Sequence, residues 1–140
     1  MKRIIVISLL LLSILACKKK EYSAEGPTDV RIRNKSTLAF EEVIVRTSEK
    51  AVDIDTIGNV AANDSVSGYF RFSKAYPKAE ISAKINVNGS KVTYSTGAVD
   101  FTYMTYIGQD KITFEVYISD MNNHVLSISN VILEEPLVMK

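Results

Sequence analysis

The residue of this 140-residue chain best placed to undergo a chemical modification is Cys17, its single cysteine. Two basic residues near the start precede an apolar run over residues 4–15, and Ala16 stands directly before the thiol. A basic end, a short apolar run and a small residue form the pattern of a secretory signal peptide. We therefore predict a signal peptide over residues 1–16 and an acylation site at Cys17.

The residues from Ile14 to Cys17 resemble the lipobox of bacterial lipoproteins, in which the cysteine receives a diacylglyceryl group before the leader is removed. As a helix the apolar run would span roughly 18 Å. Because a bilayer core is roughly 30 Å thick, a permanent membrane helix is disfavoured. The resemblance implies a mature protein held by acyl chains at the cell envelope, on the outer membrane. An ordinary secreted protein that begins with cysteine is the alternative.

Groups that catalysis commonly recruits are otherwise scarce. His124 is the one histidine of the chain, and it falls in the polar stretch 121–124, which favours an exposed turn residue over a general base or a metal ligand. No serine lies in a Gly-x-Ser-x-Gly or Ser-x-x-Lys motif, and no glycine-rich phosphate loop is present. We expect no enzymatic activity, no cofactor and no metal ion.

Carboxylates supply the enzymatic alternative. Asp53 and Asp55 are two residues apart on one predicted strand, so they share a face, and with Asp64 they could approach a calcium ion. The Asp-x-Asp-x-Asp-Gly loop that would complete such a site is absent, which favours solvated side chains. A hydrolase that uses Asp53, Asp55 or Asp100, brought together by folding, is the remaining enzymatic hypothesis.

Aromatic side chains gather in the second half of the chain. Tyrosine suits binding interfaces because it combines an apolar ring with a polar tip. We predict a partner surface, for a protein or a glycan, made of Tyr94, Phe101, Tyr103, Tyr106 and Tyr117. The alternative is that these residues fill the core and the sheet surfaces, because strands favour aromatic residues.

The segment after the anchor has the composition of a tether. Residues 17–28 contain three consecutive lysines, Gly26 and Pro27 and almost no apolar side chain, which predicts a flexible linker. Its basic triplet serves as a sorting signal or lies against anionic headgroups. The remaining body, residues 29–140, has the size of one domain. Residues 28 to 140 include 12 basic and 14 acidic side chains, a net charge of −2, which does not favour nucleic-acid binding.

Apolar residues of the body recur with a period of two, and turn residues return about every ten positions. This pattern is typical of an all-β protein, and eight short strands fit it. The first strand is expected over residues 29–34. Phe40 and Val43 differ in parity along the next strand, which predicts a β-bulge near Glu41. A further strand is expected near residues 101–106.

The clearest predicted element is a hairpin. Asn88-Gly89 separates two alternating segments, and this dipeptide tolerates the positive φ angles of a type I′ turn. A two-residue loop would pair Ile85 with Val92. It would also pair Ala83 with Tyr94.

An all-β body of this length must bury one face of each sheet against another. We first expect a two-layer antiparallel β-sandwich of immunoglobulin-like or transthyretin-like size. A small β-barrel is the second possibility. Both folds give the same alternation along the chain, so the pattern leaves the choice and the strand order open.

The chain as a whole resembles the small uncharacterised β-sandwich lipoproteins of the Bacteroidota. The resemblance lies in the lipobox with its lysine-rich continuation, in VRIRNKSTLAFEEVIV (30–45), in NDSVSGYFRFSKAY (63–76) and in DKITFEVYI (110–118). It implies a fold and a location but no activity. The leading hypothesis is a non-catalytic, lipid-anchored domain that binds a protein or a glycan. The alternatives are the carboxylate hydrolase and an inhibitor of a wall-degrading enzyme that inserts the loop 119–124.

Overall fold

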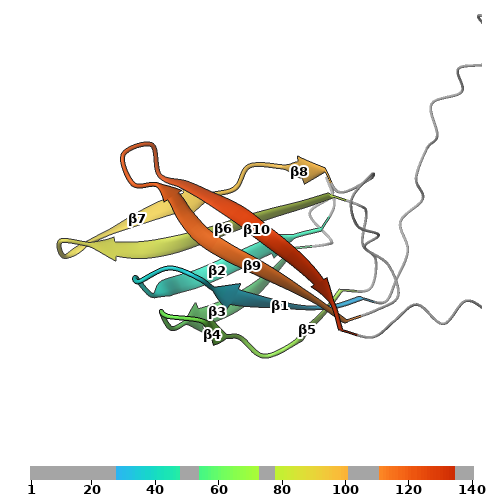
Figure 1. The fold of residues 1–140 in the computed structure, drawn as a ribbon. Coiled ribbons are helices and arrows are strands. Elements are labelled where there is room, and N and C mark those ends of the chain that lie inside the picture. Colours follow the sequence, from blue (N-terminus) through green and yellow to red (C-terminus); the bar gives the residue numbers. More distant parts are fainter. Residues whose placement is uncertain (1–27, 48–53, 73–77, 101–110, 135–140) are drawn as a thin grey trace, which may run out of the picture.

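The computed structural model of the chain describes residues 28–47, 54–72, 78–100 and 111–134. Within these ranges every regular element is a β-strand (Figure 1), which confirms the all-β prediction. The strands are β1 (Thr28–Asn34), β2 (Phe40–Arg46), β3 (Ile54–Val60), β4 (Ser65–Val66), β5 (Phe70–Phe72), β6 (Lys78–Val87), β7 (Ser90–Ser95), β8 (Val99–Asp100), β9 (Lys111–Asp120) and β10 (Val125–Leu133).

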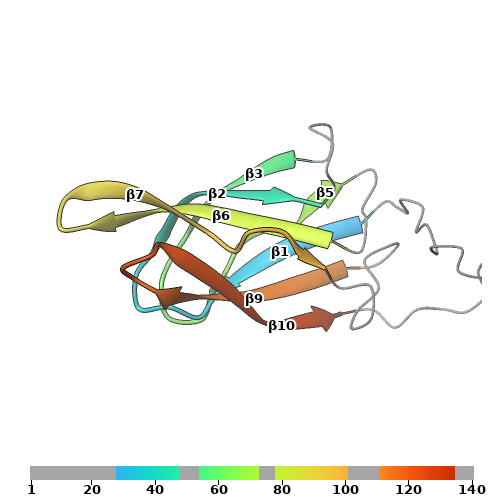
Figure 2. The same ribbon diagram turned by 90° about the horizontal axis from the view of Figure 1, so that it is seen from above.

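The strands form one rolled sheet. Their order is β3-β2-β6-β7-β10-β9-β1-β4, with β5 also paired to β1 and β8 to β6. The sheet curls until β3 contacts β1 and β5, so it is nearly closed into a barrel, the second of the two expected arrangements (Figures 1 and 2). One wall contains β2, β3, β6 and β7, and the other contains β1, β9 and β10. The walls join where β7 pairs with β10 at Ser95 and Val125.

Two of the pairings are parallel, which departs from the expected antiparallel arrangement. β1 pairs with β9 in parallel from Asp29–Lys111 to Asn34–Val116, and the β7–β10 contact is parallel as well. Parallel neighbours need a long connection. Most of the body separates β1 from β9 in sequence, so the connection is long enough, and its described residues contain strands and no helix.

The bulge predicted in β2 is confirmed. The register of β2 shifts between Phe40 and Val43 against β3, and between Glu41 and Ile44 against β6. Glu42 has a φ of 49°, as a residue pushed out of the regular ladder can adopt. The bulge places the side chains of Phe40 and Val43 on the same inner face, where both are fully buried.

The predicted hairpin is confirmed in register and in turn type. Ile85 pairs with Val92 and Ala83 pairs with Tyr94 across β6 and β7. Asn88 and Gly89 have φ angles of 51° and 85°, which are the two left-handed positions of a type I′ turn.

Two other segments differ from the simple alternation. β3 continues through Gly58, whose φ of 85° accommodates a register shift against β2. The segment 65–72 divides into β4 and β5, which both pair with β1. The described ranges contain ten strands, two of them only two residues long, where eight were expected over the whole body. The strand predicted near residues 101–106 lies outside the described residues.

The core fills the inside of the barrel with aliphatic and aromatic side chains from both walls. Its largest fully buried members are Tyr94, Phe40, Phe114, Ile32, Ile81, Ile85, Ile112 and Leu126. Burial of each large side chain stabilises the fold by about 1.5–3 kcal/mol. Because the core occupies the barrel interior, the functional surfaces must be sought on the outer faces and at the ends.

Candidate functional site

The outer face of β1 carries a line of charged side chains, each paired with a residue on a different element. We call this line the β1 ladder. Alternation along a strand sends every second side chain outward, and the ladder uses that spacing. Its ion pairs are Arg71–Asp29 (2.8 Å), Arg31–Glu134, Arg33–Glu115 (2.9 Å) and Lys35–Asp64 (2.5 Å). The ladder therefore links β1 to β5, to the end of β10, to β9 and to the turn before β4.

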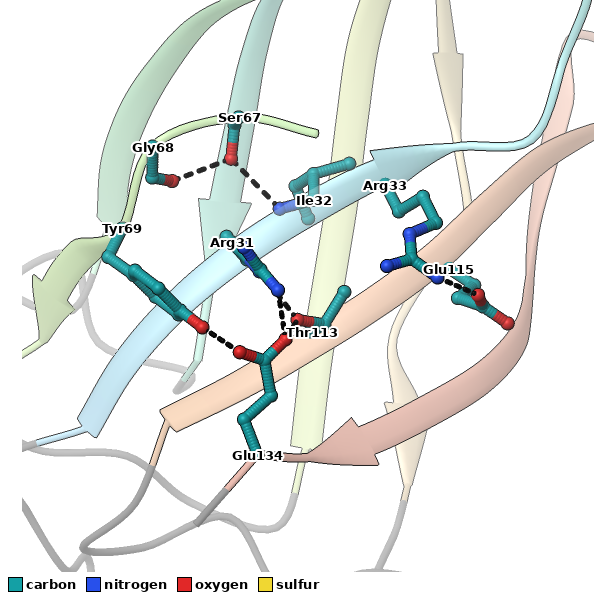
Figure 3. A network of polar contacts seen from close by, with 9 residues as sticks. All are labelled: Arg31, Ile32, Arg33, Ser67, Gly68, Tyr69, Thr113, Glu115 and Glu134. Carbon is teal, nitrogen blue, oxygen red and sulfur yellow. Dashed lines mark hydrogen bonds and ion pairs between the residues drawn. The ribbon is translucent and has the colours of Figure 1, made fainter. Parts of the chain in front are cut away.

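Glu134 is the centre of the densest part of the ladder (Figure 3). Its carboxylate accepts hydrogen bonds from Arg31, from the Tyr69 hydroxyl and from the Thr113 hydroxyl. Arg31 Nε also donates to Thr113 Oγ1 over 2.9 Å. Thr113 lies on the outer side of β9, yet it is fully buried, because these side chains cover it.

The surroundings of Glu134 keep its carboxylate ionised. Partial burial raises the pKa, but the hydrogen bonds from Thr113, Tyr69 and Arg31, together with the charge of Arg31, outweigh it and lower the pKa from 4.5 to about 2. A general base works best with a pKa near the working pH. The Glu134 carboxylate, saturated with donors, therefore suits the stabilisation of the outer face better than it suits proton transfer.

Tyr69 completes this cluster from the segment between β4 and β5. The Arg31 guanidinium lies 4.7 Å from the centre of the Tyr69 ring, and Lys111 Nζ lies 5.8 Å from it. Both distances fit cation–π contacts. Partial burial, followed by the hydrogen bond to Glu134, raises the pKa of the Tyr69 phenol. The cluster holds the β4–β5 segment against β1.

A second candidate surface lies at the end of the barrel opposite Thr28. Four connections lie at this end of the barrel, at residues 35–39, 61–64, 88–89 and 121–124 (Figure 1). We call this the turn end. Connections carried on a rigid scaffold are common places for binding residues, so the turn end is a second candidate for a binding surface.

Asn34 and Ser36 fix one half of the turn end. The fully buried Asn34 amide donates to the carbonyl oxygens of Leu38 (2.8 Å) and Val60 (3.3 Å) and accepts from the Ser36 N–H (2.8 Å). Ser36 Oγ in turn accepts from the Ile118 N–H over 2.8 Å. These bonds tie the connection 35–39 to β9 and to the end of β3, so this half of the turn end is preorganised.

The β9–β10 turn forms the other half. The Asp120 carboxylate accepts from the backbone N–H groups of Asn122 (2.9 Å) and Asn123 (3.0 Å), and these bonds, with the Asn123 amide, lower the pKa of Asp120. The exposed His124 ring packs edge-on against Tyr94 with ring centres 5.1 Å apart. The Tyr94 hydroxyl also donates to the Met121 carbonyl oxygen over 3.3 Å.

Exposed side chains of the turn end are mostly neutral and polar. They include four asparagines, Asn63, Asn88, Asn122 and Asn123. Positive φ angles explain Asn63 and Asn88 as turn residues. Each asparagine presents an amide that both donates and accepts hydrogen bonds. Beside them Met121 is 44% exposed and supplies the main apolar contact area.

Of the aromatic partner surface predicted from sequence, the described residues include Tyr94 and Tyr117. Tyr94 is only 1% exposed, so its inclusion in an accessible surface is wrong. It sits inside because its hairpin partner Ala83 points inward. Tyr117 is on the outer face of β9 and is 38% exposed. The other predicted members, Phe101, Tyr103 and Tyr106, and the acylation site Cys17 lie outside the described residues.

The carboxylates of the hydrolase hypothesis cannot be placed against one another. Asp53 lies outside the described residues, and the side chains of Asp55 and Asp100 do so as well. In the part of the chain that the structure describes, no three His, Cys, Asp or Glu side chains gather in a way that could hold a metal ion. Asp64 instead pairs with Lys35.

Sequence reasoning missed the Glu134 cluster altogether. The first strand was expected over residues 29–34, but Tyr69 and Glu134 carried no local motif. Their partners are distant in sequence, with 103 positions between Arg31 and Glu134. Of the turn end, a binding role was predicted from sequence only for the β9–β10 part, the loop 119–124.

The chain matches no family model and no curated protein. Among solved structures it is similar to a protein from Eubacterium rectale determined by NMR, with 14% sequence identity and a TM-score of 0.41 over 81% of this chain and 93% of that one. Across the described ranges, no helix is long and apolar enough to cross a bilayer.

Proposed function

We propose that this protein is a non-catalytic, lipid-anchored domain of the cell envelope that presents a binding surface to a protein or a glycan. One observation carries the proposal: the body's first strand begins at Thr28 at one end of the barrel, and a preorganised, amide-rich turn end lies at the other (Figure 1). A chain anchored through its N-terminus would hold the turn end away from the membrane.

The leader and Cys17 supply the anchor in this proposal. Two or three acyl chains on one cysteine bind a bilayer almost irreversibly, because each buried methylene contributes about 0.8 kcal/mol. Eleven residues, 17–27, separate the anchor from β1, and a chain of this length reaches at most about 40 Å. The domain would thus stay within one barrel length or so of the outer membrane. The resemblance to lipoproteins of the Bacteroidota belongs to this proposal.

The chemistry of the turn end favours a neutral hydrogen-bonding partner. Amide groups suit the hydroxyls of a glycan or the backbone of a protein loop. Hydrogen bonds donated by the Asn34 amide and accepted by the Asp120 carboxylate hold the turns in place before binding. Such preorganisation lowers the entropy cost of association. Met121 can add apolar contact area next to the amides.

Two measurements test the proposal. Metabolic labelling with an alkynyl fatty acid should mark the wild-type protein and should fail for Cys17→Ser, while circular dichroism shows that the variant is still folded. If Cys17→Ser were labelled as strongly as wild type, the proposal that Cys17 is the acylated anchor would be wrong.

Proximity labelling from the anchored protein in its native envelope should then mark a reproducible partner. The substitution Asn122→Ala at the turn end should reduce that labelling. Asn130→Ala, at an exposed asparagine of β10, is the matched control and should leave it unchanged. An equal loss in both variants, or none in either, would exclude the turn end as the binding surface.

A second candidate is inhibition of a wall-degrading enzyme by the loop 119–124. The observation that favours it is the β9–β10 turn, which projects from the barrel and is fixed by Asp120 and by the contact of His124 with Tyr94. A rigid projecting loop binds a cleft with little loss of entropy. Inhibition of at least one enzyme in a lysozyme panel is expected, and inhibition of none would discard this candidate.

A further inference from the structure

β1 is the strand through which any pull on the tether would enter the domain. It begins at Thr28, directly after the proposed tether, and pairs in parallel with β9 over six consecutive residue pairs, from Asp29–Lys111 to Asn34–Val116. The Lys35 N–H extends the contact by donating to the Val116 carbonyl oxygen over 2.8 Å. On its other edge β1 is paired with β4 and β5.

The direction of a pull decides how these pairs are loaded. A parallel partner strand ends at the opposite end of the barrel from the point where β1 begins, at the turn end (Figure 1). A force between Thr28 and the turn end therefore acts along the strand axes. All hydrogen bonds of the β1–β9 pairing then share the load and must break together. A force that separates the strands sideways from one end breaks the bonds one after another.

The β1 ladder adds side-chain links to the same strand. Arg33–Glu115 (2.9 Å) bridges β1 to β9, and Arg71–Asp29 (2.8 Å) bridges it to β5. Each pair joins side chains on neighbouring strands, so sliding β1 along its axis would pull both apart. Lys35–Asp64 (2.5 Å) does the same at the turn end. These links are perpendicular to the axial force and resist the sliding motion together with the backbone bonds.

We propose that the domain is built to bear load, with β1, β9 and the β4–β5 segment acting as a shear clamp between the membrane anchor and a partner held at the turn end. This inference rests on the proposed function for the origin of the load. The mechanical property itself does not depend on acylation, because it resides in the pairing and charges of the folded body.

Single-molecule pulling on the protein without its leader tests the clamp. The native Cys17 thiol serves as one handle. In the axial geometry Asn122→Cys, on the exposed β9–β10 turn, is the second handle. In the comparison geometry the second handle is Lys140→Cys, which follows the end of β10. That end lies beside the start of β9, since the Glu134 N–H donates to the Lys111 carbonyl oxygen over 2.9 Å.

We expect the axial geometry to unfold at a force at least about twofold higher than the comparison geometry at the same loading rate, because forced unfolding follows the height of the barrier crossed. Urea unfolding of the two handled proteins should give the same midpoint, which would assign the difference to direction and not to stability. Equal forces, or a lower axial force, would overturn the clamp.

A charge variant sharpens the test. Glu115→Gln should lower the axial unfolding force and leave the comparison force unchanged, whereas Glu42→Gln on the opposite wall should change neither. A drop in both geometries for Glu115→Gln would mean a general loss of stability and would count against the clamp. The pulling handles are attached chemically to cysteine thiols, so the pulling experiment does not need acylation. If fatty-acid labelling of Cys17 failed, the proposed anchor would be excluded, but a dependence of the unfolding force on pulling direction would still support the clamp.

Discussion

The two outer walls of the barrel use the same kinds of charged residue in different ways. On the wall of β2, β6 and β7, charges meet as separate pairs, Lys84–Glu42 at 2.7 Å, Lys91–Glu41 at 2.6 Å and Arg46–Glu80 at 3.6 Å. On the wall of β1 and β9, three donors converge on the single carboxylate of Glu134. The side chain of Glu134 is 23% exposed and that of Glu42 is 52% exposed.

This difference in surroundings decides how much each wall contributes to stability. An exposed pair gains little, because water screens the attraction and ordering two long side chains costs entropy. A carboxylate that accepts several hydrogen bonds and covers a buried hydroxyl loses those bonds together when it is removed. The comparison therefore predicts a graded series of effects, from the Glu134 cluster down to the isolated lysine pairs.

The largest effect is expected for Glu134→Gln. The variant keeps the shape of the side chain but loses the charge that faces Arg31, Tyr69 and Thr113. Hydrogen bonds to charged groups contribute about 1.5–3 kcal/mol, and we expect the free energy of unfolding to fall by about 2–3 kcal/mol at neutral pH. Urea unfolding followed by circular dichroism measures the change, and an unchanged slope would show that the unfolded state is comparable.

The outcome that would contradict this prediction is a loss below about 0.5 kcal/mol, the size typical of an exposed pair. The Glu134 cluster would then contribute no more to the free energy of unfolding than the exposed lysine pairs do. In that case the two walls would not differ in how their charges stabilise the fold.

The second prediction concerns pH. The pKa of the Glu134 carboxyl is about 2 in the folded protein, against an ordinary value of 4.5. Between these two pH values the unfolded chain therefore binds more protons than the folded protein. The stability that Glu134 contributes is complete above about pH 4.5 and is lost as the pH falls toward 2. The gap in unfolding free energy between wild type and Glu134→Gln should therefore narrow as the pH is lowered through this range.

Other carboxylates set the background of that measurement. Hydrogen bonding to Arg71 lowers the pKa of Asp29, and bonds from the Asn123 backbone lower that of Asp120. Both groups remain in the variant, so Glu134→Gln should keep part of the acid sensitivity. A gap that stays constant down to about pH 2.5 would show that these partners do not lower the pKa of Glu134 in the folded protein.

A smaller effect is expected for Tyr69→Phe. The variant removes the hydroxyl that donates to Glu134 and keeps the ring beside the Arg31 guanidinium at 4.7 Å. Because Tyr69 is 38% exposed as a residue, we expect a loss of about 1 kcal/mol in the free energy of unfolding. In a double-mutant cycle with Glu134→Gln the two losses should not add. Full additivity would mean that the two side chains do not interact in solution.

The sequence contains much of the local structure of this fold. The Asn88-Gly89 turn and the parity change around Glu41 each follow from one backbone constraint, and both are present as predicted. The pairing order does not follow in this way, since a period of two says which face a residue takes and nothing about the neighbouring strand. The alternation pattern therefore could not predict the parallel β1–β9 pairing. For the same reason it could not decide between a nearly closed barrel and a sandwich.

The candidate sites show the same division between local and distant information. Residues that pair directly across a hairpin share a face, so the predicted pairing of Tyr94 with Ala83 already implied that Tyr94 is buried. Its assignment to a partner surface overlooked that signal. The Glu134 cluster offered no such signal, because its four side chains come from β1, from β9, from the segment between β4 and β5 and from the residue after β10, which only the complete topology brings together.

The smallest effect is expected for Glu42→Gln on the opposite wall. Glu42 meets Lys84 at 2.7 Å, but both side chains are largely in water, 52% and 41% exposed, and such pairs contribute about 0–1 kcal/mol. The residue keeps its position at the β2 bulge, since glutamine has the same length and the same backbone demands.

We expect a change in the free energy of unfolding of less than about 0.5 kcal/mol, and this change should vanish at high salt because mobile ions screen exposed charges. Glu134→Gln should be measured under identical conditions. If Glu42→Gln lowers the free energy of unfolding by a similar amount, then burial and the number of donors do not decide how much a carboxylate of either wall contributes to stability. A salt-independent loss would instead point to strain at the bulge as its source.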